Sequence, residues 1–552
     1  MEKIILKIDT NLLAIRSGDR YNKNYLCNKI QNGKERGSDV DQPVKQPNLA
    51  IELKGLTKTF GEVVANKDID LTVKNGEILA LLGENGSGKT TLMNMLSGLY
   101  RPDSGEIYVD GQLVDIRSPH DAIALGIGMI HQHFKLVDVL SVRDNIVLGT
   151  KSGGKSRARL TGEINEICER FGLSVDPERK IYSLSVGEKQ TVEILKVLYR
   201  GARTLILDEP TAVLTPQETE RLFDILRRMK QQGCAVIIIT HKLNEVLSIS
   251  DRVTILRKGR TIETVQTAQA TMRSLTEAMV GQSVDLSIHR SEMKDAGRIL
   301  DVHHLTVLNE ESVKALDDVS FELHGGEILG VAGVAGSGQK ELCEAIAGLQ
   351  NVSGGAILHN DINLVGLTPR QIIKRGISMS FIPEDRLGMG LVGSMGMVDN
   401  LLLKEYQNQP GIFVDRKPPR KLAKQLIERL SIVTPGVMTP VKQLSGGNVQ
   451  KVLLGREIAS NPRILITAYP VRGLDINSSM TIYRLINEQK AKGVGVLFIG
   501  EDLDVLLELC DRIMVLCGGK VTGIVDAKEA TKEMLGLMMT GSSREEALSH
   551  AR

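Results

Sequence analysis

The stretch Gly83-Glu84-Asn85-Gly86-Ser87-Gly88-Lys89-Thr90, with Thr91 behind it, decides the fold of this chain. It matches the pattern G-x-x-x-x-G-K-[ST], in which glycines let the backbone wrap the β- and γ-phosphates of a nucleotide. The apolar run at residues 77–82 is typical of a buried parallel strand, and residues 91–96 have helical spacing. The positive end of that helix points at the phosphates, Lys89 adds a fixed charge, and the Thr90 hydroxyl is suited to ligate Mg²⁺. Strand, loop and helix in this order favour a phosphate site over a glycine-rich turn without a ligand.

Length and composition narrow the class of protein. A chain of 552 residues should form at least two domains, and its 42% hydrophobic content is that of a globular protein. The net charge of +2 gives no reason to expect nucleic acid as a partner. The six cysteines include no C-x-x-C pair, which argues against zinc and redox centres. No apolar run approaches the roughly 20 residues of a membrane-spanning helix. We therefore expect a cytoplasmic protein that meets a membrane only through a partner.

The sequence predicts that the first domain is an α/β domain with a central, mostly parallel sheet. Buried strands are predicted at 204–207, 235–240 and 251–256, and they alternate with helical segments. Ligands of such folds bind beyond the carboxyl ends of the strands. Phe60 is predicted on a loop between the first two strands of the domain.

The sequence then repeats itself. Gly76-Glu77-Ile78-Leu79 recurs as Gly326-Glu327-Ile328-Leu329, an offset of 250 residues, and Leu184-Ser185 recurs as Leu444-Ser445. A period this long indicates a domain duplication. We predict a disordered extension at 1–48, a first domain at 49–286, a linker at 287–297, a second domain at 298–541 and a tail at 542–552.

Several polar residues at the predicted strand ends suit the hydrolysis of a phosphoanhydride. Asp208 can hold Mg²⁺, and Glu209 beside it can orient and partly deprotonate a water. His241 can donate to the γ-phosphate, Gln132 can reach metal and water, and Phe60 can stack on adenine. Each alone has a structural explanation as a cap, a strand end or a core residue. Together they lie at the mouth of one predicted sheet, where a catalytic site belongs.

This ordered set of motifs resembles the nucleotide-binding subunit of an ABC transporter, in the tandem form found in sugar and nucleoside importers. The resemblance covers about residues 49–541 and rests on Phe60, the phosphate loop 83–90, Gln132, Leu184-Ser185-Val186-Gly187-Glu188, Leu205-Ile206-Leu207-Asp208-Glu209-Pro210 and His241. It implies two ABC-type ATPase domains, each with a parallel-sheet core and a helical subdomain. It also implies ATP and Mg²⁺ as cofactors, two transmembrane permease subunits, and an extracytoplasmic substrate-binding protein or lipoprotein. The protein would then lie peripherally on the cytoplasmic face of the cell membrane.

The resemblance further implies that the two halves meet head to tail, with ATP between the phosphate loop of one half and the signature loop of the other. The second signature loop, Leu444-Ser445-Gly446-Gly447-Asn448-Val449-Gln450-Lys451, would complete the first site. The implied ATP-binding residues are Phe60, Gly83, Glu84, Asn85, Gly86, Ser87, Gly88, Lys89, Thr90, Thr91, Ser445, Gly446, Gly447 and Asn448. The implied metal ligands are Thr90, Gln132 and Asp208, and the implied catalytic residues are Glu209, His241 and Gln132. The loop Arg472-Gly473-Leu474-Asp475 is expected to contact the first site.

The second half departs from the family pattern at its own site. Gln339 and Lys340 stand where Lys89 and Thr90 stand in the first half. The other replacements are Ala468 for Asp208, Tyr469 for Glu209, Glu501 for His241 and Glu384 for Gln132. Losing such groups costs orders of magnitude in rate. We predict one working ATPase site per chain, with nucleotide binding at the second site left open.

The leading interpretation is ATP hydrolysis that drives import of a small solute, with nucleosides favoured over simple sugars by analogy. Permeases should dock on the segment from Leu136 to Leu148. A soluble tandem ATPase acting on ribosomes or DNA remains an alternative, although such proteins usually keep both sites intact and have a long charged joint. A nucleotide-binding regulator without turnover is disfavoured by Asp208, Glu209 and His241.

Overall fold

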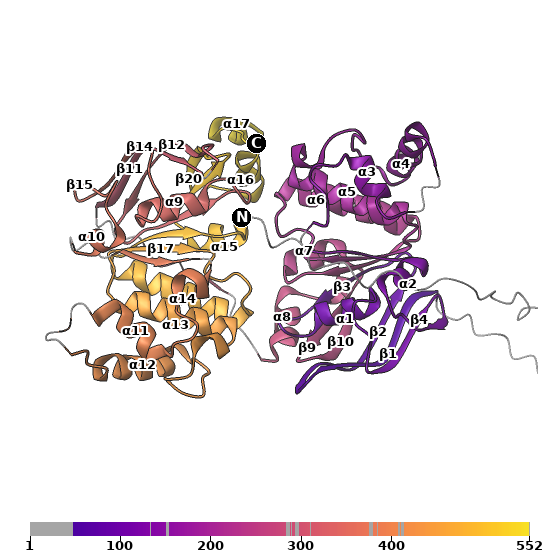
Figure 1. Ribbon diagram of the computed structural model, residues 1–552, viewed down its shortest axis with the longest axis horizontal. Helices are drawn as coiled ribbons and strands as arrows, with labels where there is room; N and C mark the ends of the chain where they lie inside the picture. The colour runs from indigo at the N-terminus through magenta and orange to yellow at the C-terminus, as the bar shows by residue number, and fades with distance from the viewer. Residues whose placement is uncertain are drawn as a thin grey trace, which may run out of the picture. The chain divides into compact units, whose positions relative to one another are not determined.

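The computed structural model describes most of the chain from residue 48 onward. The described ranges are 48–132, 134–150, 154–282, 287–288, 290–292, 297–309, 311–374, 379–383, 385–406, 409 and 413–550. The predicted disordered extension lies outside these ranges except for Asn48. Figure 1 shows the two halves of the described part, each with sheets and covering helices.

The first half contains ten strands and eight α-helices in its described residues. The strands are β1 (Leu49–Phe60), β2 (Val63–Lys74), β3 (Ile78–Leu82), β4 (Ser104–Val109), β5 (Gln112–Val114), β6 (Ile127–Ile130), β7 (Thr204–Asp208), β8 (Ala235–Ile239), β9 (Arg252–Arg257) and β10 (Arg260–Gln266). The helices are α1 (Lys89–Leu96), α2 (Pro119–Ala124), α3 (Val142–Val147), α4 (Arg157–Phe171), α5 (Val186–Tyr199), α6 (Pro216–Gln231), α7 (Leu243–Ile249) and α8 (Met272–Val280).

The central sheet of the first half has the order β10-β9-β3-β8-β7-β6, and a smaller sheet has the order β2-β1-β4-β5. All neighbours in the central sheet pair in parallel except the edge pair β10–β9. Strands β3 and β8 are buried at every residue, as expected for parallel strands covered on both faces. The predicted mostly parallel α/β core is confirmed.

The second half repeats this order. Its strands are β11 (Arg298–Leu308), β12 (Lys314–His324), β13 (Ile328–Ala332), β14 (Gly354–His359), β15 (Ile362–Asn363), β16 (Met379–Ile382), β17 (Ile464–Ala468), β18 (Gly495–Ile499), β19 (Arg512–Cys517) and β20 (Lys520–Asp526). Its helices are α9 (Gln339–Ile346), α10 (Pro369–Lys374), α11 (Met397–Glu405), α12 (Lys417–Leu430), α13 (Gly446–Ala459), α14 (Ile476–Ala491), α15 (Leu503–Leu509), α16 (Lys532–Met539) and α17 (Arg544–His550). The sheet orders β16-β17-β18-β13-β19-β20 and β12-β11-β14-β15 mirror those of the first half.

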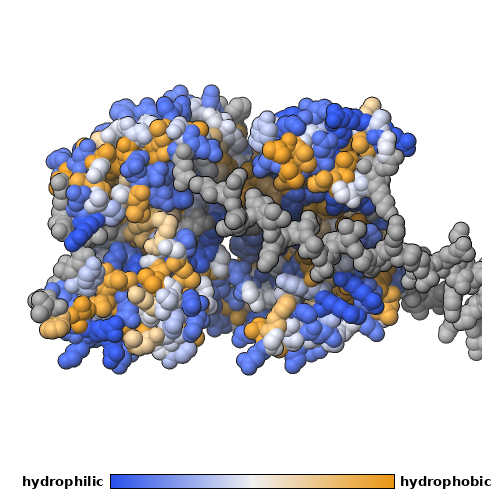
Figure 2. All heavy atoms as spheres, in the orientation of Figure 1, coloured by the Kyte–Doolittle hydropathy of each residue, from blue (hydrophilic) through white to orange (hydrophobic). Residues whose placement is uncertain are grey.

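Each half has a helical part with its own apolar packing. In the first half, α3, α4 and α5 pack against one face of the central sheet in a shared core cluster that includes Ile146, Ile164 and Leu195. Figure 2 shows hydrophobic residues gathered on the surface over the helical part of the first half. The helical subdomain implied by the resemblance is therefore present.

Ion pairs hold the same positions in both halves. Arg252 pairs with Glu77 at 3.1 Å, and its counterpart Arg512 pairs with Glu327 at 2.6 Å. Lys230 pairs with Asp251 at 2.6 Å, and Lys490 pairs with Asp511 at 2.7 Å. The arginine pairs join segments 175 and 185 positions apart, whereas the lysine pairs join residues 21 positions apart, and together they tie the strand framework on which the sites stand.

The two halves touch through equivalent elements. The Asn244 side chain on α7 donates to Asp504 on α15 at 2.8 Å, and these positions are 260 residues apart, one repeat length. Gln217 on α6 donates to the carbonyl of Glu533 on α16 at 3.2 Å, and Ile476 on α14 packs against the cluster that contains residues of α8. Since α14 and α16 repeat α6 and α8, the contacts are reciprocal and describe a pseudo-two-fold arrangement.

The linker and the tail are attached to the second half. Arg290 donates to the carbonyl of Glu508 at 3.2 Å, and Lys490 donates to the carbonyl of Ser291 at 2.5 Å. The segment predicted as a tail contains α17, whose Ala547 is buried in the second core. Among the helices of the described ranges, none combines the length and apolarity needed to span a membrane.

Candidate functional site

The phosphate loop connects the buried strand β3 to helix α1 (Figure 1). Gly88 has a φ of 99°, which an L side chain rarely adopts, and a Cβ there would lie 2.5 Å from the carbonyl oxygen of Ala65. Glycine is therefore required for both conformation and space. The loop brings together Gly83, Glu84, Asn85, Gly86, Ser87, Gly88, Lys89, Thr90 and Thr91, as the sequence predicts.

Lys89 is folded back onto its own loop. Its ammonium donates to the carbonyl of Gly83 at 2.6 Å and to that of Glu84 at 2.9 Å. Burial lowers the pKa of Lys89, while the carboxylates of Glu209, Asp208 and Glu84 act in the opposite direction. The loop thus contains a largely buried cation, and an anionic ligand beside it would offset the cost of that burial.

The carboxyl ends of β6, β7 and β8 bring three predicted side chains together. Glu209 accepts a hydrogen bond from Nε2 of Gln132 at 3.2 Å through Oε2, and Nδ1 of His241 lies 2.9 Å from Oε1. Glu209 has a φ of 46°, a conformation that costs a non-glycine residue about 1–2 kcal/mol. Its N–H donates to the carbonyl of Ile239 at 2.9 Å, so the neighbouring strand holds this backbone in place.

Two adjacent carboxyl groups have opposite electrostatic environments. Burial and, next, the charge of Glu209 raise the pKa of Asp208 to about 6, against the lowering effect of Lys89. The hydrogen bond with His241 is the main cause of the lowered pKa of Glu209, against the effect of burial. Glu209 is therefore an ionised acceptor at neutral pH, whereas Asp208 lies in a position where a bound cation would relieve its cost.

The prediction for the backbone at Phe60 was wrong. Phe60 is the last residue of β1, not part of a loop, because β1 and β2 pair as far as Phe60 and Val63. Its ring is 43% exposed and packs edge-to-face on Tyr100, with centroids 5.2 Å apart. An exposed aromatic ring at a strand end suits a stacking platform as well as the predicted loop did.

The second half has the same backbone with different chemistry. Tyr469 has a φ of 49°, and its N–H donates to Ile499 at 3.0 Å, as Glu209 does to Ile239. Gln339 is buried and donates to the carbonyl of Val334 at 3.2 Å, in the place of the Lys89 contact but without charge.

Further side chains of the second site are bound to one another. Glu501 pairs with Arg472 at 3.3 Å, and the guanidinium of Arg472 lies 5.8 Å from the ring centroid of Tyr469. The position that replaces Gln132, Glu384, lies outside the described residues. Among the described residues, the second site therefore has neither the carboxylate base nor the histidine of the first.

The second signature loop lies next to residues that touch the first phosphate loop. The Asn85 side chain donates to the carbonyl of Leu474 at 3.2 Å, as expected for the loop 472–475. A Cβ on Gly446 would lie 4.0 Å from Leu474, so the start of α13 lies close to the residue that accepts the hydrogen bond from the first phosphate loop.

The start of α13 is open to a ligand. Ser445 does not cap α13, and its hydroxyl accepts from the Asn448 side chain at 2.8 Å. A hollow of about 370 Å³ lies beside it, lined by Asp385, Arg386, Leu387, Leu444, Gly446 and Val449. That volume is within the usual range of small-molecule sites.

Three residues near the first site were not predicted. Thr211 donates through its hydroxyl to Glu245 at 2.6 Å, and Lys242 donates to the carbonyl of Thr211 at 3.1 Å. Lys242 also pairs with Glu245 at 3.0 Å. Their adjacency to Pro210 and His241 in the sequence was the available signal.

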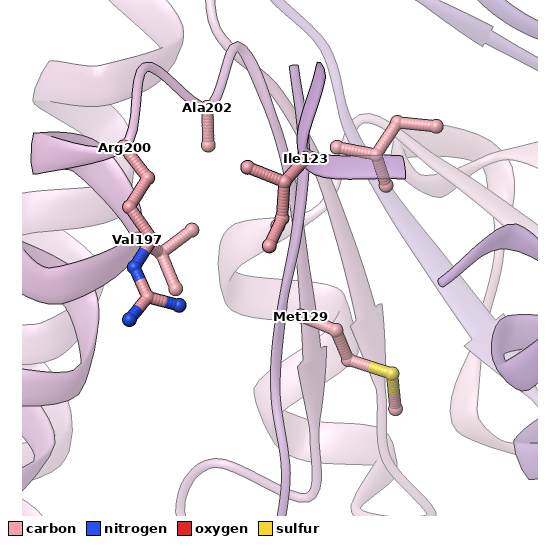
Figure 3. Close-up of a pocket in the computed structure, with 7 residues that line it drawn as sticks. Ile123, Met129, Val197, Arg200 and Ala202 are labelled. Atoms are coloured by element: carbon pink, nitrogen blue, oxygen red, sulfur yellow. The ribbon is translucent and has the colours of Figure 1, made fainter. Parts of the chain in front are cut away.

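The first half also contains a hollow, which results from the packing of its helices on the sheet. It encloses about 70 Å³ between α2, β6 and the end of α5, and it is lined by Ile123, Met129, Val197, Arg200 and Ala202 among others (Figure 3). A Cβ on Gly128 would lie 1.9 Å from Val197, so this glycine allows α5 to approach the sheet. The hollow is too small for a nucleotide and includes none of the predicted site residues.

Comparison with known proteins gives matches over nearly the whole chain. The family model described as ABC transporter matches residues 66–212 and 316–470. Nucleoside import ATP-binding protein NupA of Lactococcus lactis subsp. cremoris (strain MG1363) is 41% identical over 499 residues, covering 89% of this chain and 98% of that protein. Guanosine import ATP-binding protein NupO of Bacillus subtilis (strain 168) is 43% identical over 504 residues, with 90% and 98% covered. Ribose import ATP-binding protein RbsA 1 of Rubrobacter xylanophilus (strain DSM 9941 / JCM 11954 / NBRC 16129 / PRD-1) is 40% identical over 498 residues, with 89% and 98% covered.

Proposed function

The chain belongs to the ABC transporter family and is an ATPase of that family, and on this premise we propose that its ATP hydrolysis drives the import of nucleosides. The group of Gln132, Glu209 and His241 at the strand ends of the first half supports hydrolysis, and the choice of nucleosides as the solute is supported by the similarity to NupA and NupO. The second half has Tyr469 and Glu501 in place of Glu209 and His241. The proposed site is single, and it is completed by the second signature loop, Ser445 to Asn448.

The proposed chemistry is attack of water on the γ-phosphorus of ATP, in which the new P–O bond forms as the bond to the β,γ-bridging oxygen breaks and ADP leaves. Glu209, ionised and oriented by Gln132 and His241, accepts the proton of the attacking water. His241 in its imidazolium form donates through Nδ1 to Glu209 and through Nε2 to the γ-phosphate. Lys89 exchanges its contacts with Gly83 and Glu84 for the phosphate oxygens.

The residues proposed for Mg²⁺ fit this ion by their chemistry. Thr90, Gln132 and Asp208 offer hydroxyl, amide and carboxylate oxygens, which are hard ligands. The raised pKa of Asp208, caused first by burial, is the environment expected of a carboxylate that receives a cation. When bound, Mg²⁺ neutralises charge on the phosphate oxygens.

The proposed partners are two permease subunits and an extracytoplasmic substrate-binding protein or lipoprotein, with this chain on the cytoplasmic face of the membrane. The segment from Leu136 to Leu148 is the proposed docking surface, since Val137, Val139 and Leu148 expose 40%, 70% and 48% of their surface. Closure of the two halves on ATP and their opening after hydrolysis would move the permeases.

The experiment is ATP-dependent uptake in liposomes that contain this chain and the permeases that co-purify with it. We expect labelled guanosine to enter when ATP and the binding protein are present, and the variant Glu209→Gln to abolish entry. Uptake of ribose without guanosine would overturn the nucleoside assignment and favour the sugar-importer alternative, which the similarity to RbsA 1 supports. Co-purification with ribosomes instead of permeases would overturn import itself.

A further inference from the structure

The first half contains a polar cluster that its duplicate does not. Thr211, Lys242 and Glu245, hereafter the positioning cluster, connect the loop after Glu209 to the start of helix α7. Their counterparts at the repeat spacing are Val471, Asp502 and Val505, which cannot form the same contacts.

The positioning cluster is not needed to build the local backbone. In the first half, Ala212 donates to the carbonyl of Glu209 at 3.3 Å and Leu214 to that of Thr211 at 3.4 Å. In the second half, Arg472 donates to Tyr469 at 3.2 Å and Leu474 to Val471 at 3.0 Å. The same turn therefore forms around Val471, without a hydroxyl or an ion pair.

The cluster is well placed to hold Glu209 and His241 in register. Thr211 is 2% exposed and follows Glu209 by two residues, while Lys242 directly follows His241. Lys242 and Glu245 bind the carbonyl and hydroxyl of Thr211, so these contacts join the loop after Glu209 to the loop after His241. A displacement of one ångström between a base and its orienting group can cost about 100-fold in rate.

We propose that Thr211, Lys242 and Glu245 are positioning residues for the reaction at the first site. They fix the distance between Glu209 and His241 and touch neither ATP nor water. This inference rests on the proposed function, in which Glu209 and His241 act in hydrolysis. It explains why a cluster of this kind accompanies the base and the histidine in one half and is replaced where both are lost.

The test is steady-state ATPase kinetics of the full chain with the variants Thr211→Val and Lys242→Met. We expect kcat to fall about tenfold with the KM for ATP unchanged within twofold, because the phosphate loop is intact. The variant Thr211→Ser retains the hydroxyl and should restore kcat. Val471→Thr, the matched change in the second half, should leave both constants unchanged.

Several outcomes would overturn the proposal. Unchanged kcat in both variants would do so, as would a defect in KM alone, or a Thr211→Ser variant as slow as Thr211→Val. Because Lys242 is partly exposed, Lys242→Met should fold even where Thr211→Val does not, and thermal melting checks both. Glu209→Gln is measured alongside: full activity there refutes the proposed function, whereas an inactive Glu209→Gln with an active Thr211→Val refutes this inference alone.

Discussion

The two halves of this chain have the same strands and ion pairs, but they differ in the side chains at the strand ends that form the nucleotide sites. The pairs Arg252–Glu77 and Lys230–Asp251 in the first half recur as Arg512–Glu327 and Lys490–Asp511 in the second. The strained backbone at Glu209 recurs at Tyr469 with nearly the same φ. The comparison shows that the ion-paired residues are the same in both halves because folding requires them. The side chains that follow β7 and β17, Glu209 and Tyr469, differ.

The most informative part of this comparison is the positive φ of Tyr469, which persists although the carboxylate of Glu209 has no counterpart there. A positive φ at a non-glycine residue is commonly interpreted as a sign of function. Here Tyr469 has that conformation with no carboxylate to present, because its N–H is held by the neighbouring strand as in the first half. The strain at this position therefore belongs to the turn and does not by itself mark a catalytic site.

The strongest test of the difference between the halves is a matched pair of substitutions at the strand ends. Glu209→Gln should reduce ATP hydrolysis about 1,000-fold, since an amide cannot accept the proton of water at neutral pH. The affinity for MgATP should remain, because the phosphate loop is unaltered. Phosphate release and calorimetric binding of MgATP measure the two quantities.

The matched variant is Tyr469→Phe, which should change hydrolysis by less than twofold. A comparable loss in Tyr469→Phe, or two phosphates released per chain in a single turnover, would contradict the assignment of one active site.

A second test concerns the shared framework. Lys490 is fully buried against Asp511, so Lys490→Met leaves an unpaired buried carboxylate and should cost about 3 kcal/mol of stability. Lys230 makes the same pair, but both side chains are about one-third exposed, and Lys230→Met should cost less than about 1 kcal/mol. Urea unfolding followed by circular dichroism measures both, and equal losses would show that burial does not distinguish the pairs.

The smallest expected effect is on the pH dependence of stability. The pKa of Asp208 is raised from its ordinary value of 3.8 to about 6, first by burial. The folded state thus favours the protonated form. Above pH 6 the ionised carboxylate lowers the free energy of unfolding, whereas below pH 4 the group is protonated in both states and this loss is absent. Asp208→Asn should therefore raise the Tm of the nucleotide-free protein by about 3 °C at pH 7.5.

That gain in Tm should shrink as the pH falls from 6 to 4. The second half, with Ala468 at this position, provides the comparison: Ala468→Asn should give no gain with this pH profile. A gain in Asp208→Asn that is independent of pH would show that the carboxylate is not the cause.

Much of the fold was predictable because the sequence repeats and its strands are apolar throughout. Residues 204–207 and 235–239 are buried strands as predicted, and the polar residues after them converge because parallel strands end at one edge. The sequence places Phe60 on a loop because it lies between the alternating runs 51–53 and 69–73, whereas pairing with β2 extends β1 to this residue.

The contact between Thr211 and Glu245 was not predicted, since the only signal was that Thr211 follows Pro210 and Lys242 follows His241 in the sequence. Thr211 meets Glu245 across 34 positions, and the meeting depends on how α7 leaves β8. The contact of Asn85 with Leu474 spans 389 positions, and it was expected only from the family resemblance. Spacing in the sequence shows which strand ends converge, but not which side chains then pair.

The contact between Asn244 and Asp504 also has an evolutionary consequence. In a dimer of identical subunits, a residue on the two-fold axis faces its own copy, so aspartate would face aspartate and repel it. Once both copies belong to one polypeptide, each can diverge, and here one side donates while the other accepts at 2.8 Å. The two halves are therefore no longer interchangeable, because a homodimer of either half would place two identical side chains at this contact. This makes the fusion hard to reverse.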